Sequence, residues 1–362
     1  MAGKVKSFDI EQMLLNKIES GEYPHNAFLP SENELARVFH AARNTVRKAL
    51  AALEQRGLLI KGQGRSSRVN YPKTVHKQPE HFLAWMWYQP LTGLTENIVY
   101  FEMFQLMVEL ARDEKVGIKF FDIGPHAGWT PAVLDTPRCI GCFSVGITSD
   151  RIDRGVLEQL KKIPRLISID EAGAPLGACV VSIDNYASGK LAATHLLHDC
   201  QYRKIAIINT DGEQSMPFRE RISGFCDAAR EYPDVSIEFM TFDRHLHLPE
   251  SASARQDFLH FHRHLDAIFC LTDLLALNML DSAGKLGIRV PEELAVMGFD
   301  GIYTSQHITP HLTTVAQPNG KVIRAALDLA LAQYRNPGME PPSSIKYTGK
   351  VLCGETTRIR VR

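Results

Sequence analysis

The 362-residue chain has no apolar run that approaches the length of a membrane span, and its N-terminus lacks an apolar signal segment. It has only seven cysteines, an odd number, scattered along the chain and mostly within apolar runs. That distribution favours reduced thiols over a disulfide framework. We therefore expect a cytoplasmic protein that does not contact a membrane.

Catalytic and cofactor motifs are also missing. A Walker loop, a Gly-x-Ser-x-Gly sequence and a metalloprotease motif are absent, so the sequence indicates neither an enzyme nor a cofactor. Cys139 and Cys142 form a lone CxxC, and zinc would need two further ligands. His260, His262 and His264 place two imidazoles at i and i+4 of an expected helix. We interpret the cysteines as part of a buried strand and the histidines as a solvated helix face, without a metal site.

The net charge is zero, yet the charges are unevenly distributed. Residues 1–70 contain 11 Lys/Arg and 7 Asp/Glu, so the rest of the chain is mildly acidic. A chain of this length is expected to form more than one domain. A basic head on an acidic body favours a small nucleic-acid-binding module joined to a second unit.

Residues 1–70 have the pattern of three short helices. Residues 8–20 carry an apolar stripe, and a glycine follows them. Ser31 and Glu34 match a capping box at the start of a second helix. Residues 43–55 repeat apolar side chains at helical spacing, which predicts a third helix with one buried face.

The opposite face of the third expected helix is polar and cationic. Such a face suits insertion into the DNA major groove, where the first residues of a helix meet base edges and phosphates. Residues 58–60 and 67–70 are predicted to form two paired strands, joined by a tight cationic turn at 61–65. This arrangement indicates a winged helix-turn-helix.

The ordered motif LPSENELA…RNTVRKAL…LEQRGLL…GQGR resembles the GntR-type DNA-binding domain across residues 8–70. The resemblance implies DNA contacts from the third helix, a wing tip in the minor groove, and one DNA-facing residue in the preceding helix. Ala42 stands where many members have serine, so the third helix lacks that N-cap. The DNA-binding residues predicted in this way are Asn33, Arg43, Asn44, Thr45, Arg47, Lys48, Gln63, Gly64 and Arg65.

Residues 71–80 hold two prolines and no apolar periodicity, which predicts a linker. The body beyond them alternates short apolar runs with amphipathic stretches, a rhythm typical of an α/β fold with parallel sheets covered by helices. Its length of about 280 residues favours two lobes. The expected strands are 82–87, 118–123, 140–145, 166–169, 180–183, 205–208, 237–242, 267–270 and 294–297, with a C-terminal strand near 346–353.

From Val180 onward the body resembles the LacI/GalR-type regulatory domain, which has the fold of periplasmic sugar-binding proteins. The matching segments are VSIDNYASGKLAATHLL, RKIAII, RERISGF, DAIFCLTDLLAL, VPEELAVMGFDG and LTTVAQP. The resemblance implies an effector-binding and dimerisation domain at 81–362, built from two doubly wound parallel sheets. We expect lobe 1 at about 82–182 and 312–338, and lobe 2 at about 184–308 and 339–362.

A ligand is expected where parallel strands end. Asp170 and Asp300 each follow an expected strand, Arg221 begins a helix, and all three match effector-contacting positions of the family. Aromatic side chains are expected to stack on the ligand. Thr272 stands beside Asp273, where the family often has an Asn. The effector-binding residues predicted in this way are Trp87, Tyr88, Asp170, Arg221, Phe242, Thr272 and Asp300. The alternatives are that the two aspartates cap helices or pair with Arg221, and that Trp87 belongs to the core.

The two resemblances together imply a dimeric bacterial-type repressor that binds a double-stranded operator and a small effector. Arabinose-responsive repressors have the same combination of domains, so a pentose or related sugar is the first hypothesis for the effector. A solute-binding protein, an α/β enzyme, and a regulator that responds to a protein partner remain as alternatives.

Overall fold

The computed structural model describes residues 7–61, 66–71, 80–88, 98–124, 131–147, 152–169, 176–209, 216–242 and 251–359. The chain divides into two units, Met1–Gln78 and Pro79–Arg362, which we call the head and the body. In the described ranges, no helix combines the length and apolar character needed to cross a bilayer.

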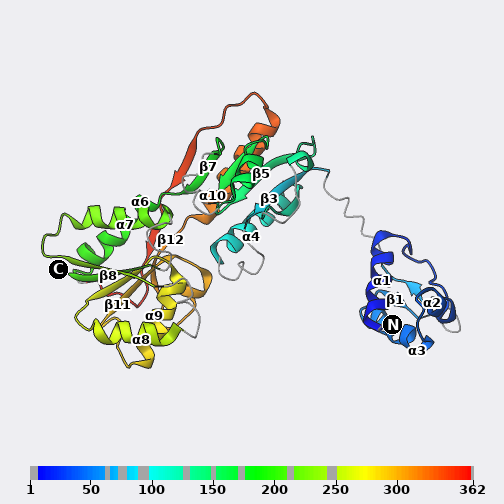
Figure 1. Cartoon of the computed structure of the whole chain (residues 1–362), viewed down its shortest axis with the longest axis horizontal. Coiled ribbons are helices and arrows are strands. Elements are labelled where there is room, and N and C mark those ends of the chain that lie inside the picture. Colours follow the sequence, from blue (N-terminus) through cyan, green and yellow to red (C-terminus); the bar gives the residue numbers. More distant parts are fainter. Residues whose placement is uncertain are drawn as a thin grey trace. The chain divides into compact units, whose positions relative to one another are not determined.

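The head has three helices and a short antiparallel strand pair (Figure 1). These elements are α1 (Ser7–Ser20), α2 (Glu32–Val38), α3 (Arg43–Gln55), β1 (Leu59–Ile60) and β2 (Arg68–Val69). They bury one apolar cluster, which includes Ile10, Leu14, Leu35, Val46 and Leu53. The predicted winged helix-turn-helix order is confirmed by these elements and by their shared core.

The helix ends of the head follow local sequence signals. The Ser31 Oγ atom accepts a hydrogen bond from the Glu34 N–H, and Glu34 accepts one from the Ser31 N–H at 2.8 Å, which confirms the capping box. Gly57 follows α3 at φ +72°, a conformation that favours glycine and ends the helix. Ala42 is the N-cap of α3 and provides no side-chain hydrogen bond.

The first sheet of the body has the strand order β13-β7-β6-β5-β3-β4, and all its pairs are parallel. Helices α4 (Ile98–Asp113) and α10 (Asn319–Arg335) cover one face (Figure 1). Helix α5 (Arg154–Leu160) packs on the other. The strands are β3 (Phe82–Trp87), β4 (Gly117–Asp122), β5 (Cys139–Val145), β6 (Leu166–Ile169), β7 (Cys179–Ile183) and β13 (Ser344–Tyr347).

The second sheet has the order β14-β12-β11-β10-β8-β9, and it is parallel except for the antiparallel β12–β14 pair. Helices α6 (Asn185–Ala193) and α7 (Met216–Ala229) cover one face, whereas α8 (Ala252–Phe261) and α9 (Asp273–Lys285) cover the other. The strands are β8 (Lys204–Asn209), β9 (Ser236–Thr241), β10 (Ala267–Cys270), β11 (Ala295–Asp300), β12 (Thr313–Ala316) and β14 (Lys350–Leu352). Two six-stranded sheets, parallel except for β14 and each covered by helices, confirm the predicted α/β fold class.

The assignment of the C-terminal segments to lobes needs a correction. We expected 312–338 in lobe 1 and 339–362 in lobe 2, but β12 pairs with β11 in the second sheet and β13 pairs with β7 in the first. The chain therefore changes lobe after β12 and again after β13. Strand β12 was not predicted because its two threonines, Thr313 and Thr314, are polar in sequence yet fully buried in the sheet.

Candidate DNA-binding face and effector site

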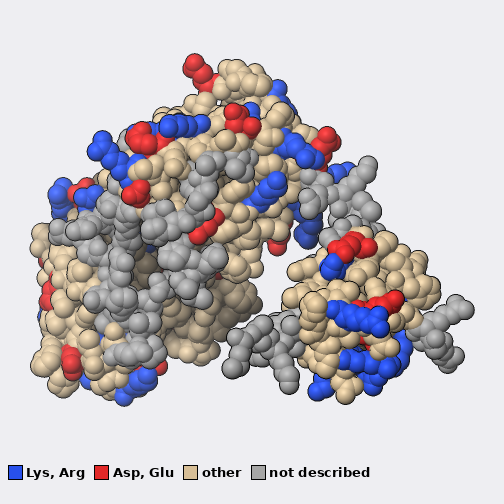
Figure 2. All heavy atoms as spheres, turned by 45° about the vertical axis from the view of Figure 1, so that its right-hand side comes forward, with Lys and Arg blue, Asp and Glu red and all other residues tan. Residues whose placement is uncertain are grey.

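The start of α3 presents a cationic surface. Arg43, Asn44, Arg47 and Lys48 are exposed, and Thr45 is half-buried. Figure 2 shows basic side chains gathered on one side of the head. Asn33 is exposed on α2, while Gln63, Gly64 and Arg65 lie outside the described residues.

Glu32 connects the arginines of this surface, which the sequence did not reveal. Its carboxylate accepts a hydrogen bond from Arg43 Nε at 2.8 Å and another from Arg47 Nη2 at 3.1 Å. The hydrogen bonds from Arg47 and Arg43 hold the pKa of Glu32 below its usual value. Since both guanidinium groups share one carboxylate, Glu32 fixes their orientation at the N-terminal end of α3.

Arg221 is the centre of a polar cluster in the body. Its side chain is nearly fully buried on α7, although a guanidinium cannot give up its charge. Nε donates to the Asn185 side-chain oxygen at 2.9 Å, and Nη1 donates to the Leu271 carbonyl at 2.5 Å. The guanidinium carbon lies 3.7 Å from the centre of the Phe299 ring. Residues of α6, α7 and β11, and the residue that follows β10, therefore converge on one cation.

Asp300 completes the cluster as the last residue of β11. Its Oδ1 atom lies 3.5 Å from Arg221 Nη1 and accepts a hydrogen bond from Gln317 Nε2 at 2.8 Å. Burial raises the pKa of Asp300 to about 7, although the positive charge of Arg221 lowers it. The backbone at Asp300 has φ +131°, which is unusual for a residue other than glycine and is typical of functional sites.

Asp273 stabilises the backbone next to Asp300. It is fully buried, and its two oxygens accept hydrogen bonds from the Thr314 hydroxyl at 2.6 Å and the Ile302 N–H at 3.0 Å. The carboxylate thus holds the turn that follows Asp300. A Cβ atom at Gly298 would collide with Asp273 Oδ1, so glycine is needed for this close approach. Thr272 is the N-cap of α9, and its side chain accepts a hydrogen bond from the Leu275 N–H.

The remaining predicted effector residues have different surroundings. Trp87 is 2% exposed and packs edge-on against Tyr100, which agrees with the alternative that it belongs to the core. The Tyr88 hydroxyl accepts a hydrogen bond from the Asp153 N–H at 2.6 Å. Phe242 is half-buried against Phe258, and Asp170 lies outside the described residues. The structure therefore brings together Arg221 and Asp300. Thr272 is the residue after Leu271, whose carbonyl accepts a hydrogen bond from Arg221.

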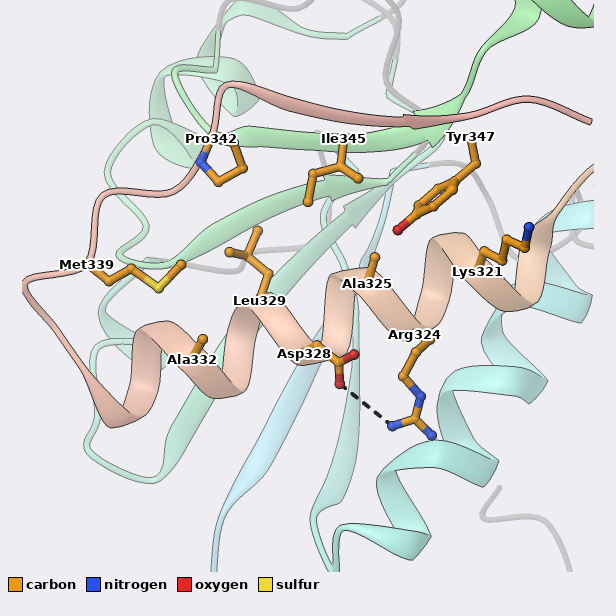
Figure 3. A pocket seen from close by; sticks show the side chains of 10 residues that line it. All are labelled: Lys321, Arg324, Ala325, Asp328, Leu329, Ala332, Met339, Pro342, Ile345 and Tyr347. Atoms are coloured by element: carbon orange, nitrogen blue, oxygen red, sulfur yellow. Dashed lines mark ion pairs between the residues drawn. The ribbon is translucent and has the colours of Figure 1, made fainter.

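A separate groove lies between α10 and β13, with a volume of about 550 Å³ (Figure 3). Its lining is largely apolar and includes Leu329, Met339 and Tyr347, with the ion pair Arg324–Asp328 at its rim. None of the predicted effector-binding residues that the structure describes lines it. This groove is therefore distinct from the cluster around Arg221.

The histidine cluster differs from its prediction. Helix α8 ends at Phe261, so His264 lies beyond the helix, and the predicted i, i+4 helical pair does not form. His262 Nε2 and His264 Nε2 instead lie 3.8 and 2.6 Å from oxygens of Glu238 on β9. Among the described residues, no group of three His, Cys, Asp or Glu side chains is arranged to hold a metal ion.

Comparison with known proteins identifies both parts of the chain. Residues 6–69 match the bacterial regulatory proteins of the gntR family, and residues 193–357 match the periplasmic binding protein-like domain. The chain thus combines a GntR helix-turn-helix domain with a periplasmic-binding-protein-like domain. Its homologues include transcriptional repressors, and its structural neighbours include LacI-family regulators.

The HTH-type transcriptional repressor CytR of Escherichia coli (strain K12) is 29% identical over 202 residues, which cover 55% of this chain and 58% of CytR. The chain therefore spans less than two thirds of that relative's length. Among solved structures, a LacI family transcriptional regulator from Arthrobacter sp. FB24 in complex with lactose has a TM-score of 0.61 at 24% identity. That match covers 77% of this chain and 100% of the other.

A second solved structure has the same fold. It is a periplasmic binding protein/LacI transcriptional regulator from Alkaliphilus metalliredigens QYMF complexed with D-xylulofuranose, with a TM-score of 0.60 at 21% identity. The match covers 76% of this chain and 99% of the other. The TM-scores of the two matches show that the body shares the fold of these structures.

Proposed function

We propose that this chain is a transcriptional repressor that binds operator DNA through its head and a small sugar through its body. The observation that carries the proposal is the exposed cationic start of α3 in a GntR-type head. Arg43 and Arg47 project from the first turns of that helix, which is where base edges are read in the major groove. The same chain continues into a body whose relatives include transcriptional repressors.

A gel-shift assay on DNA fragments flanking the chain's own gene, at stated salt, tests the DNA-binding part. Arg43→Ala should weaken specific binding by about 1–3 kcal/mol if Arg43 reads a base through two hydrogen bonds. Arg56→Ala is the matched control, because Arg56 is an exposed arginine at the other end of α3, paired with Glu11. Equal affinity for all fragments, or equal losses in both variants, would contradict the proposal.

The effector is proposed to be a neutral polyhydroxylated molecule that contacts Arg221 and Asp300. The guanidinium donates hydrogen bonds and the carboxylate accepts them, so together they match hydroxyl groups, which do both. A phosphate would be repelled by Asp300. The two structural neighbours hold lactose and D-xylulofuranose, which is consistent with a sugar here.

A thermal-shift screen of the whole chain tests this proposal, because a ligand that binds the folded state stabilises it by mass action. Pentoses and other neutral sugars are expected to raise the unfolding temperature of the body, while their phosphate esters should not. Stabilisation by the phosphate esters alone would contradict a neutral ligand. If no neutral sugar acts but a protein partner alters DNA binding, the body would not be a sugar sensor.

The active form is proposed to be a homodimer, since a two-fold symmetric operator needs a two-fold protein. Each sheet of the body ends on an edge strand with an exposed phenylalanine, Phe120 on β4 and Phe239 on β9. Phe101 on α4 is also 45% exposed. Large apolar side chains at sheet edges favour contact with a second copy.

Sedimentation of the whole chain tests the dimer. Phe239→Asp should shift the molecule towards monomer, whereas Val38→Asp in the head, at a similarly exposed position, should not. A dimer unaffected by substitution of both Phe120 and Phe239 would contradict this interface.

The signal is proposed to pass through the two lobes. Glu102 on α4 accepts a hydrogen bond at 3.1 Å from the N–H of Tyr303, which begins the 3-10 helix Tyr303–Gln306 of the other lobe. A ligand that favours one lobe arrangement shifts the population of dimers whose heads match the operator. A regulator of this kind acts in the cytoplasm and needs no catalytic group.

A further inference from the structure

Cys139 and Cys142 lie side by side in the body. Both are 1% exposed, and their sulfur atoms are 3.6 Å apart. In a regular strand, residues three apart face opposite sides of the sheet. Their contact therefore requires an irregularity in β5.

The register of β5 against β3 shows this irregularity. Cys139 is opposite Phe82 and Cys142 is opposite Ala84, so three steps along β5 match two steps along β3. A β-bulge at this point inserts one extra residue and returns both cysteines to the same face. Both side chains accordingly belong to the cluster beneath α5, whereas Ile140 packs against α10 on the other face.

The same bulge brings the Cα atoms of Cys139 and Cys142 close enough for a disulfide bond between their side chains. Two strand residues on β3 span about 6.6 Å, which sets the separation of the two cysteine Cα atoms. Disulfides are found with Cα separations up to about 6.8 Å. The two sulfurs need to approach by roughly 1.6 Å, which side-chain rotation can supply.

We propose that Cys139 and Cys142 form a reversible intramolecular disulfide that responds to peroxide. Cys139 is the attacking sulfur, because the hydrogen bond that it shares with Cys142 and the positive charge of Arg165 lower its pKa. The hydrogen bond with Cys139 and burial raise the pKa of Cys142, so it remains the protonated partner. Arg165 is fixed there by its Nη2 hydrogen bond to the Cys139 carbonyl at 2.9 Å.

The reaction balances with hydrogen peroxide as the oxidant. The Cys139 thiolate attacks one peroxide oxygen, an S–O bond forms, the O–O bond breaks, and the hydroxide takes a proton to leave as water. The Cys142 sulfur then attacks the Cys139 sulfur, an S–S bond forms, and the S–O bond breaks. The proton of Cys142 leaves with the second water, so two thiols lose two electrons and the peroxide gains them.

The disulfide would form where the chain enters the body. Arg138, next to Cys139, donates a hydrogen bond from Nε to the Glu80 carbonyl at 3.1 Å, and the His81 ring packs against Tyr334. Oxidation would therefore stiffen β5 beside the first residues of β3. Disulfides that form in reducing compartments are usually transient and either catalytic or redox-sensing.

Peptide mapping of the whole folded protein tests the proposal. Trypsin cuts after Arg138 and Arg151, so both thiols lie on one peptide. After exposure to peroxide and blocking with N-ethylmaleimide, this peptide should lose two hydrogens, bind no maleimide, and bind two maleimides after treatment with dithiothreitol. Cys179 and Cys270 in the same digest are also buried in strands, but burial raises the pKa of both thiols, so they should oxidise at least about ten times more slowly.

Variants separate the two sulfurs. In Cys142→Ala, Cys139 should be trapped as a sulfenic acid by dimedone, and in Cys139→Ala, Cys142 should stay reduced. Two thiols that both remain open to maleimide while the exposed Cys353 is oxidised would overturn the proposal. A disulfide that forms only in urea would overturn it as well.

Discussion

Arg221 and Asp300 are both almost fully buried, and their closest charged atoms lie 3.5 Å apart. This separation is longer than a direct hydrogen bond. Arg221 Nη1 instead donates to the Leu271 carbonyl at 2.5 Å, and Asp300 Oδ1 accepts a hydrogen bond from Gln317 Nε2 at 2.8 Å. Each charge is therefore held in place by a neutral neighbour. The Arg221 and Asp300 pair thus places a hydrogen-bond donor beside an acceptor, a combination that matches the hydroxyl groups of a polar ligand.

Replacing Arg221 is expected to abolish the effect of the sugar on operator binding. Arg221→Ala leaves Asp300 buried without its cation and the Leu271 carbonyl without its donor. The free energy of unfolding of the body should fall by about 3–5 kcal/mol. Arg221→Lys keeps the positive charge but loses the planar array of donors, so it should fold and still fail to bind the sugar. Calorimetry with the sugar found in the screen measures both effects.

The control for this prediction is Arg230→Ala, because Arg230 follows the same helix and its side chain is 80% exposed. It should change neither the stability of the body nor the sugar affinity. Wild-type sugar affinity in Arg221→Lys would place the ligand away from this cluster.

Sugar binding is expected to depend on pH through Asp300. Its pKa of about 7 means that the carboxyl is partly protonated at neutral pH. A sugar hydroxyl that donates to the carboxylate favours its charged form, so binding releases a proton. As the pH increases towards 7, the sugar affinity should therefore rise by up to about tenfold per pH unit. Above pH 7 it should level off.

The stability of the effector-free protein should change with pH in the opposite direction. Because the pKa of Asp300 is higher in the folded state than in the unfolded chain, its contribution is complete below about pH 4 and is lost as the pH rises through about 7. Asp300→Asn removes both effects. A sugar affinity that stays constant from about pH 5 to about pH 8 would mean that Asp300 does not accept a hydrogen bond from the ligand.

The sequence predicted the elements of the fold well because local signals were strong. The capping box of Ser31 and Glu34 and the apolar positions of α3 each depend on neighbours within a few residues. Strand β12 was missed because Thr313 and Thr314 are buried through hydrogen bonds to distant partners, Thr356 and Asp273. Pairing between residues more than 40 positions apart leaves no periodicity to read.

The candidate site could be predicted only in part for the same reason. Family resemblance indicated Arg221 and Asp300, but their neighbours Asn185 and Gln317 act through side-chain hydrogen bonds that no spacing predicts. The bulge that unites Cys139 and Cys142 depends on the register with β3. In sequence, the same pair looked like an ordinary buried strand.

Glu32 is expected to control how selectively the head binds DNA. Its carboxylate holds Arg43 and Arg47 and places a negative charge on the surface that we propose binds DNA. Glu32→Gln removes that charge, so affinity for unrelated DNA should rise several-fold. Affinity for the operator should rise less, because the two arginines lose their fixed orientation. Fluorescence anisotropy with operator and scrambled duplexes at several salt concentrations measures the ratio.

Glu11→Gln is the matched control, since Glu11 pairs with Arg56 at 2.8 Å at the other end of α3. That variant should leave the ratio of specific to unspecific affinity unchanged. A similar rise for both duplexes in Glu32→Gln would mean that Glu32 acts through charge alone.

Adding the missing cap to α3 is expected to stabilise the head. Ala42 is exposed and has the extended backbone of an N-cap, so a serine hydroxyl at this position can accept a hydrogen bond from an N–H of the first turn. Ala42→Ser should add about 0.5–2 kcal/mol to the free energy of unfolding of the head. Hydrogen exchange of the α3 amides in the whole chain should then slow by about 2- to 30-fold.

Ala51→Ser provides the control, because Ala51 is exposed in the middle of the same helix, where serine has no cap to form. There the lower helix propensity of serine should destabilise the helix by roughly 0.5 kcal/mol, so exchange should be slightly faster. The two variants are thus expected to change protection in opposite directions, although both introduce the same hydroxyl into the same helix. Faster exchange in both would mean that the backbone at position 42 does not allow serine to cap α3.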